Sequence, residues 1–148
     1  MTDSDEKIIA QAIDILSTDL RHRGDVLKSP SLVKRYLTLR LARMERELFG
    51  ILLLNAKNEL TAVEDLFFGT LVQTTVHPRE VVKTTLRHNA AYLICYHNHP
   101  SGDTKPSEAD RLLTTTLQQA MQLIDVRILD HIIVGGMETY SFAEHGEL

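Results

Sequence analysis

The stretch that decides the fold and the chemistry of this chain is HNHPSGDTKPSEAD, residues 97–110. An apolar segment leads into it, so we expect His97 and His99 at the end of a strand, on one face and about 6.8 Å apart along the chain. Two imidazoles placed in this way can converge on one metal ion, with bonds of about 2.0–2.1 Å to zinc. Asp110 lies one turn into an expected helix and can return to the same point. Two histidines and one carboxylate leave a fourth tetrahedral position for water, as in catalytic zinc sites.

The same residues also fit a purely structural interpretation. Ser107-Glu108-Ala109-Asp110 matches S-x-x-D, a helix capping box in which both end residues bind backbone N–H groups. An H-x-H pair also occurs by chance, and the nearby prolines and glycine can simply shape a turn. Capping and metal binding compete for the same oxygens of Asp110, so spacing alone leaves both interpretations open.

Strand and helix patterns alternate on both sides of this stretch. The continuous apolar run 48–54 is typical of a strand buried on both faces, and Pro78 suits the first turn of a helix. We expect strands at 48–54, 60–63, 71–76, 91–96, 126–134 and 139–142, and helices at 78–89 and 107–124. This order predicts an α/β or α+β fold, in which helices are interleaved with a mixed sheet.

Two amphipathic helices precede the first expected strand. Apolar residues recur at helical spacing between Ile9 and Leu20, and Thr2, Asp3 or Ser4 can cap that helix. Ser29-Pro30-Ser31 is a start signal for a second helix. A further apolar face of this pair has no assigned partner, so these helices are also a candidate surface for a homodimer.

Length, charge and cysteine content are those of a single globular domain. The chain has 148 residues, and 16 Lys and Arg residues against 20 Asp and Glu residues leave a formal charge of −4. Cys95 is the single cysteine and cannot form an internal disulfide, which indicates a reducing compartment. No apolar run approaches the roughly 20 residues of a membrane helix, and the acidic N-terminus does not resemble a secretory signal. We therefore expect a cytoplasmic protein with no membrane partner.

Residues 21–46 form a basic segment. Eight Lys or Arg residues accompany two acidic ones there, so the local charge is 8 − 2 = +6. Such a stripe can bind phosphate or an acidic partner, nucleic acid included. A solvated helix face explains the same charges, and the modest length of the stretch favours this simpler interpretation.

Three blocks of the chain resemble the RadC family, which belongs to the JAMM (MPN-type) metallopeptidase-like superfamily. They are residues 97–110, Val76-His77-Pro78-Arg79-Glu80-Val81 and Leu129-Asp130-His131-Ile132-Ile133-Val134-Gly135. The similarity spans about residues 45–145, most of the chain. It implies a JAMM/MPN-like (cytidine deaminase-like) mixed β-sheet flanked by helices. On this basis we expect an N-terminal helical extension at 1–45 and a RadC-type JAB/MPN domain at 46–148.

The resemblance also implies roles for individual residues. The implied set is His97, His99 and Asp110 as zinc ligands, Ser107 as a stabiliser of an oxyanion, and Glu47 as general acid/base. Glu45 is the alternative to Glu47 if the register slips, because its side chain would point to the same face. Zinc lowers the pKa of bound water to about 7, and a partly buried carboxylate suits the transfer of its proton to a leaving amine.

We therefore expect a zinc-dependent metallopeptidase or isopeptidase-like hydrolase, in which zinc-activated water attacks an amide bond of a protein or peptide. The alternative is an accessory protein of DNA repair or recombination with a non-catalytic metal site, which the basic segment and the family's traditional association motivate. The chain has no P-C-x-x-C and no H-E-x-x-H, which excludes a zinc nucleoside deaminase and a helix-borne zincin site.

Other residues near these motifs have structural interpretations. Cys95 is expected to be a small core residue rather than a ligand. Asp130 and His131 are expected to serve their strand rather than to support the ligands. Tyr96 and Asn55 stand where family members often have a small residue and an aspartate, and we expect neither to touch a proposed ligand.

Overall fold

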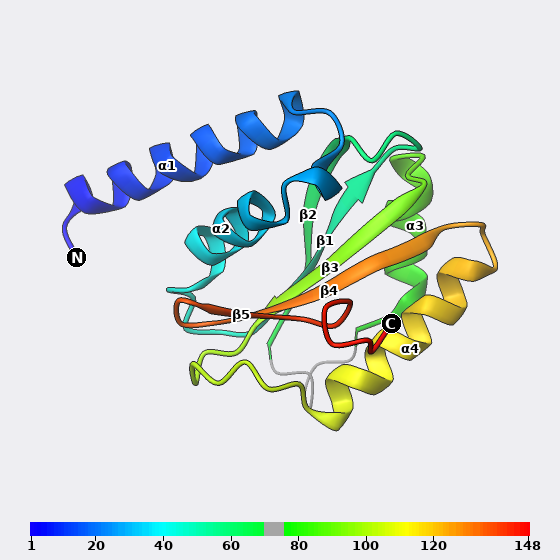
Figure 1. Ribbon diagram of the computed structural model, residues 1–148. Coiled ribbons are helices and arrows are strands. Elements are labelled where there is room, and N and C mark those ends of the chain that lie inside the picture. Colours follow the sequence, from blue (N-terminus) through cyan, green and yellow to red (C-terminus); the bar gives the residue numbers. More distant parts are fainter. Residues whose placement is uncertain (70–75) are drawn as a thin grey trace.

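The computed structural model describes residues 1–69 and 76–148 (Figure 1). In chain order its elements are α1 (Asp3–His22), η1 (Val26–Lys28), α2 (Pro30–Leu41), β1 (Leu48–Leu54), β2 (Leu60–Phe68), α3 (Pro78–Arg87), β3 (Tyr92–Asn98), α4 (Glu108–Gln122), β4 (Arg127–Gly135) and β5 (Glu138–Ser141). The predicted mixed α/β fold is confirmed. The expected strand at 71–76 falls on residues outside this description except for Val76, which belongs to no strand.

The strands form one five-stranded sheet in the order β2-β1-β3-β4-β5. Strand β1 runs antiparallel to both β2 and β3, β3 runs parallel to β4, and β5 returns antiparallel to β4. Helices α1 and α2 lie over one face of this sheet, while α3 and α4 lie over the other (Figure 1). The chain leaves the carboxyl end of β3 and continues through a loop into α4.

Strand β1 is buried along its whole length, as its unbroken apolar sequence predicts. Leu48 and Leu52 belong to the core beneath α2, whereas Phe49 and Ile51 belong to the core beneath α3 and α4. This alternation follows from the two-residue period of a strand. The same alternation applies to the residue before β1. Glu47, two positions before Phe49, is expected to face the same side of the sheet as Phe49.

Gly50 allows a large side chain to cross the centre of the sheet. A Cβ atom there would lie 2.4 Å from Cζ of Tyr96, so only glycine leaves room for this tyrosine. The Tyr96 hydroxyl donates to Asp65 over 2.6 Å and accepts from Arg40 over 2.8 Å, and Arg40 also forms a bidentate pair with Asp65. Helix α2 is thereby tied to β2 and β3. As expected, the described hydrogen bonds of the Tyr96 side chain are with Arg40 and Asp65 and not with the predicted ligands.

Both N-terminal helices form as the sequence predicts. Thr2 caps α1, and Pro30 opens α2. The apolar face that ends at Leu20 packs on the α2 side of the sheet, whereas Ile8 and Ile15 are exposed. Four of the eight basic residues in the segment 21–46 form ion pairs: Arg23 with Asp19, Lys34 with Glu144, Arg40 with Asp65 and Arg43 with Glu6.

Helices among the described residues are all too short or too polar to cross a bilayer. Elsewhere the structure differs from expectation mainly at the ends of elements. Strand β2 continues to Phe68 rather than ending at Val63, and β3 includes His97 and Asn98. His77 and His88 are the N-cap and C-cap residues of α3.

Candidate metal centre

Three side chains meet at the carboxyl end of β3. Nε2 of His97 lies 3.0 Å from Oδ1 of Asp110, Nε2 of His99 lies 3.1 Å from Oδ2 of Asp110, and the two Nε2 atoms are 3.1 Å apart. Ligand atoms about 2.0–2.1 Å from a tetrahedral zinc ion stand roughly 3.3 Å from one another. The three contacts are close to that spacing, although they involve both oxygens of Asp110, and one ligand atom from each residue lies within 4.8 Å of the other two. These three residues could hold a metal ion.

Backbone contacts place the three residues independently of any ion. His97 is the penultimate residue of β3, and the His99 amide donates to the carbonyl of Val134 over 2.8 Å. The loop that follows turns at Gly102 and passes so close to β4 that a Cβ on Gly135 would lie 2.7 Å from the Gly102 oxygen. Glycine at position 135 thus lets this loop deliver Asp110 to the histidines.

The capping box and the metal-binding arrangement of Asp110 coexist. Ser107 Oγ accepts the Asp110 amide over 3.0 Å, and Asp110 Oδ2 accepts the Ser107 amide over 2.8 Å, so α4 begins with a complete capping box. The same carboxylate presents Oδ1 to His97 and Oδ2 to His99. Two oxygens with about four lone-pair directions suffice for both tasks. The two roles that seemed to compete are therefore combined, because the cap orients the carboxylate toward the imidazoles.

The electrostatics keep this carboxylate ionised. Burial raises the pKa of Asp110, but hydrogen bonds with His97 and His99 outweigh it and hold the pKa far below its usual value. The hydrogen bond with Asp110 raises the pKa of His99 in spite of partial burial. In the metal-free protein a proton therefore occupies part of the space between these atoms, and a cation that binds there has to displace it.

His131 extends the cluster away from solvent. Its Nε2 lies 2.7 Å from Nδ1 of His97, and its Nδ1 lies 2.5 Å from the hydroxyl of Thr114 on α4. Burial, together with the neighbouring His97, holds the pKa of His131 well below its usual value, so this ring is neutral. The expectation of a purely strand-serving His131 is wrong, because β4 lies beside β3 and turns the ring toward the ligand.

The donors and acceptors of these hydrogen bonds assign the tautomers of the histidines. The Thr114 hydroxyl donates to the carbonyl of Asp110 over 2.8 Å, so it must accept from Nδ1–H of His131. A neutral His131 then offers a lone pair at Nε2, which accepts from Nδ1–H of His97. Because the His99 Nδ1 faces the carbonyl of Asp103 over 2.7 Å, it too carries a hydrogen. Both histidines thus use Nδ1–H for a second contact and direct Nε2, the nitrogen that a metal ion would bind, toward Asp110.

The comparisons with known proteins place the chain. The family model of the RadC-like JAB domain matches residues 27–147. The chain belongs to this family. It is 50% identical over 148 residues to the UPF0758 protein YkfG of Escherichia coli (strain K12), which covers all of this chain and 94% of that protein. The UPF0758 protein YeeS of the same organism is 48% identical over 148 residues, covering both chains completely.

Longer relatives contain a similar region. A UPF0758 protein of Janthinobacterium sp. (strain Marseille) is 57% identical over 125 residues, which make up 84% of this chain and 56% of that relative. The matched RadC-like JAB range includes α2, whose apolar residues share a core with β1 and β3. The RadC resemblance read from the sequence blocks is confirmed.

Glu47 of this RadC-like JAB domain directly precedes β1 and is partly buried, whereas Glu45 is exposed. Glu47 lies two residues before Phe49, so its side chain is expected on the same side of the sheet as Phe49 and its strand partner His97. The Glu47 carboxylate is close enough to raise the pKa of His99 by its charge. Its backbone carbonyl accepts the Gly69 amide over 2.8 Å. These observations favour Glu47 over Glu45 as the carboxylate associated with the cluster, and its catalytic role stays a prediction.

Two further candidates lie away from the ligand atoms. Cys95 is fully buried, and burial raises the pKa of its thiol to about 12 with a smaller contribution from Asp130, so it is a protonated core residue. Asp130 accepts the amides of His131 and Ala143 and the hydroxyl of Ser141. Asp130 thus supports the turn after β5, as its expected structural role implies.

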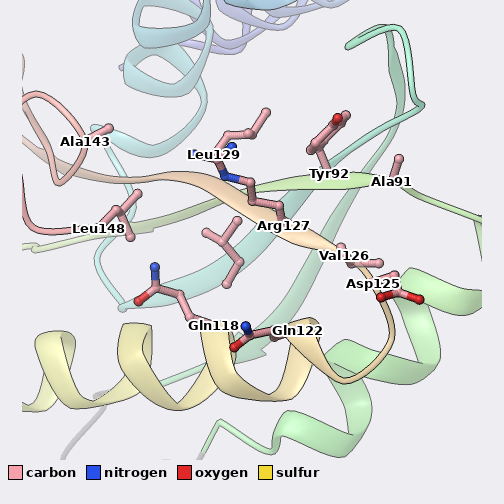
Figure 2. Close-up of a pocket in the computed structure, with 11 residues that line it drawn as sticks. Ala91, Tyr92, Gln118, Gln122, Asp125, Val126, Arg127, Leu129, Ala143 and Leu148 are labelled. Carbon is pink, nitrogen blue, oxygen red and sulfur yellow. The ribbon is translucent and has the colours of Figure 1, made fainter.

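A cavity of about 650 Å³ lies at the other end of the sheet, where β3 and β4 begin (Figure 2). Tyr92, Arg127 and Gln122 are among the residues that line it, and none of the five predicted site residues does. The histidines stand at the opposite end of β3. The cavity is therefore separate from the candidate metal centre.

The sequence patterns did not indicate two residues that support the cluster: Thr114, which no motif marks, and His131, which was expected to serve its strand. His131 stands in a block that carries the family resemblance, and this was the only signal for it. Its contact with His97 depends on the parallel register of β3 and β4, which is a long-range property.

Proposed function

We propose that this protein is a zinc-dependent hydrolase that cleaves amide bonds in a protein or peptide, in the manner of a JAMM metallopeptidase or isopeptidase. The observation that carries the proposal is the triangle of 3.0–3.1 Å among His97, His99 and Asp110. Two imidazole nitrogens and one carboxylate are a donor set that suits zinc and leaves an open position. A bound zinc ion would polarise the substrate carbonyl and supply hydroxide at neutral pH.

Exposure within the cluster supports a site that a substrate can reach. The side chains of His97 and Asp110 are 1% and 2% exposed, whereas that of His99 is 14% exposed. Ser107 is exposed, and Glu47 is partly so. The exposure of His99, Ser107 and Glu47 supports a cluster that is open to a substrate on one side, while the buried His131 lies behind His97.

Glu47 is proposed to move the proton. Its carboxylate would accept a proton from water at the cluster and deliver it to the nitrogen of the departing amine. Its charge already acts on the His99 ring, which supports a location within reach of the same space.

Ser107 is proposed to donate a hydrogen bond to the oxygen on which charge develops. Its oxygen accepts the Asp110 amide, so the hydroxyl hydrogen can be directed to a substrate. A preorganised donor of this kind lowers the barrier because it is already oriented when charge appears. The capping bond thus gives the Ser107 hydroxyl a defined position.

Metal content is the first experiment. Protein purified without chelators is expected to contain near-stoichiometric zinc by inductively coupled plasma mass spectrometry, and Asp110→Ala to have lost it. Glu47→Gln should keep the metal and lose turnover of a quenched-fluorescence peptide or isopeptide library. Zinc-free wild-type protein that also fails to take up added zinc would refute the proposal. Normal turnover by Glu47→Gln would remove the acid/base role alone.

The alternative of a DNA-associated accessory protein has less support. The basic segment motivates it, but four of the eight cations there are already neutralised by ion pairs within the fold. Fewer cations then remain to release counterions from DNA. Salt-dependent binding of duplex DNA that weakens in an Arg35→Ala, Lys28→Ala variant would favour this alternative. A homodimer through α1 also stays a prediction, for which the exposed Ile8 and Ile15 are the residues to change.

A further inference from the structure

Asn98 stands between the two predicted histidine ligands but faces the other side of the sheet. His97 contacts Asp110 on α4, and Tyr96 belongs to the core beneath α2, so the alternation of β3 directs Asn98 toward the α2 side. The Asn98 residue is buried, with 2% of its surface exposed. A buried amide must find partners, and Asn98 finds them all in the segment that leads into β1.

The partners of Asn98 bracket Glu47. Asn98 Oδ1 accepts the amide of Leu48 over 2.7 Å, and Nδ2 donates to the carbonyl of Arg46 over 3.0 Å. A longer contact of 3.5 Å joins Nδ2 to the carbonyl of Met44. The peptide groups before and after Glu47 are therefore both held by one side chain, while the Glu47 carbonyl accepts from Gly69.

The ladder between β1 and β3 explains why a side chain is needed here. Backbone pairing of the two strands ends at Phe49 and His97. One step further, the Leu48 amide is buried and still requires an acceptor, which the Asn98 side chain supplies in place of backbone. The Leu48 amide requires an acceptor, and the Arg46 carbonyl accepts from a donor. A single asparagine amide offers both, whereas aspartate lacks the donor and serine lacks the second branch.

We propose that Asn98 is a positioning residue that sets where the Glu47 carboxylate stands relative to the metal ligands, and that it acts through the backbone of residues 46–48. This inference rests on the proposed function of the site. Asn98 is adjacent to His97 and His99 in the chain. A shift of the end of β3 therefore moves the two histidines together with the hydrogen bonds that Asn98 makes to residues 46–48. The distance between Glu47 and the cluster is thereby preserved when the edge of the sheet moves.

The test uses Co²⁺ as the probe, added to metal-free full-length protein. The visible absorption of bound Co²⁺ is followed against pH, and its midpoint reports the charge next to the ion. Removing the Glu47 charge in Glu47→Gln should raise this midpoint by roughly one pH unit, because the carboxylate attracts the divalent ion more strongly than the single proton that the ion displaces. Asn98→Leu, which has similar size but no hydrogen bonds, should move the midpoint in the same direction without changing the Co²⁺ stoichiometry. In the double variant the midpoint should equal that of Glu47→Gln alone.

Tyr96→Phe is the matched control. It lies two residues before Asn98 on the same face of β3 and loses the bonds to Arg40 and Asp65, but it does not touch residues 46–48. Its midpoint should equal that of the wild type. Asn98→Asp keeps the acceptor for Leu48 and should give an intermediate midpoint, with folding of each variant checked by thermal melting.

The outcomes separate the two proposals. Wild-type protein that does not bind Co²⁺ would refute the metal site, and this inference with it. Normal binding and a normal Glu47→Gln effect, with wild-type midpoints for folded Asn98 variants, would overturn the role of Asn98 alone. So would midpoint changes that add in the double variant, loss of Co²⁺ only in the Asn98 variants, or unfolding of both Asn98→Leu and Asn98→Asp.

Discussion

Nε2 of His131 lies 2.7 Å from Nδ1 of His97, and this buried contact connects a proposed ligand on β3 to Thr114 on α4. Because Nδ1 of His97 is engaged by His131, Nε2 is the nitrogen that faces Asp110 and that a cation would bind. Partners of this kind fix the tautomer and orientation of a metal-binding histidine and commonly account for 10–100-fold in metal affinity. The ring of His131 is therefore part of the site's chemistry even though it touches no proposed substrate.

Replacing Thr114 with Val tests this chain of hydrogen bonds. The change conserves shape but removes the acceptor for Nδ1–H of His131, so His131 no longer has a preferred tautomer. We expect zinc affinity, measured by isothermal titration calorimetry, to fall by about tenfold. Thr115→Val on the exposed side of α4 is the control, since its hydroxyl donates to the carbonyl of Arg111 within the same helix. Equal zinc affinity in the two variants would contradict the tautomer assignment.

Metal affinity should depend on pH through His99. Its pKa is raised in the metal-free protein, mainly by the bond with Asp110, so zinc competes with a proton up to a pH above about 6.5. Affinity should therefore rise as the pH increases through the raised pKa of His99 and level off above it. Competition titrations with a chelating dye between pH 5.5 and 8.5 measure this. A flat profile would show that His99 does not hold the competing proton.

The stability of the metal-free protein should change in the opposite sense. A group with a raised folded pKa stabilises fully below its unfolded pKa and loses that contribution as the pH rises through the folded pKa, which is the case of His99. Asp110 has a lowered pKa, so its contribution is present above about pH 3.9 and is lost as the pH falls. His131 has a pKa well below its usual value, so its contribution is lost as the pH falls below about 6.5. Metal-free protein should thus melt at its highest temperature close to about pH 6.5, between the ranges in which His131 and His99 lose their contributions. His99→Gln should abolish the decline on the basic side, and a persistent decline would assign it elsewhere.

Gly50→Ala should destabilise the fold without a direct effect on the cluster. The new methyl would lie 2.4 Å from the Tyr96 ring and 2.6 Å from the carbonyl oxygen of Glu64, and a backbone carbonyl cannot move aside easily. We expect a loss of about 3 kcal/mol in the free energy of unfolding measured with urea. Gly24→Ala has open space around it and a positive φ of 79°, so it should cost only the backbone strain of about 1–2 kcal/mol. Equal losses would indicate that the sheet relaxes around residue 50.

Ser107 has two separable tasks, and two variants distinguish them. Ser107→Ala removes the cap of α4 and should cost about 1 kcal/mol of stability. Ser107→Asp can restore the cap because its carboxylate accepts the Asp110 amide, but it cannot donate to a developing oxyanion. We expect stability to recover in Ser107→Asp while peptide hydrolysis stays low. Recovery of hydrolysis together with stability would show that Ser107 acts only as a cap.

Local patterns predicted the elements of this fold well. The apolar run of β1 was found with its ends, because a strand buried on both faces has an unmistakable composition. The alternatives for Asp110 could not be separated by spacing. Only the path of the loop past Gly135 decides that one carboxylate caps α4 and faces two imidazoles at once.

The sequence by itself determined the order of strands and helices, the H-x-H and S-x-x-D motifs that bring three ligands together, and the family. Tertiary structure decided what surrounds those ligands. Thr114 and His131 reach His97 because α4 and β4 pack beside β3, and Asn98 reaches the backbone around Glu47 because β1 pairs with β3 at one register. Periodicity reports the face on which a side chain lies, whereas the identity of its partner depends on strand pairing across 50 residues between Leu48 and Asn98.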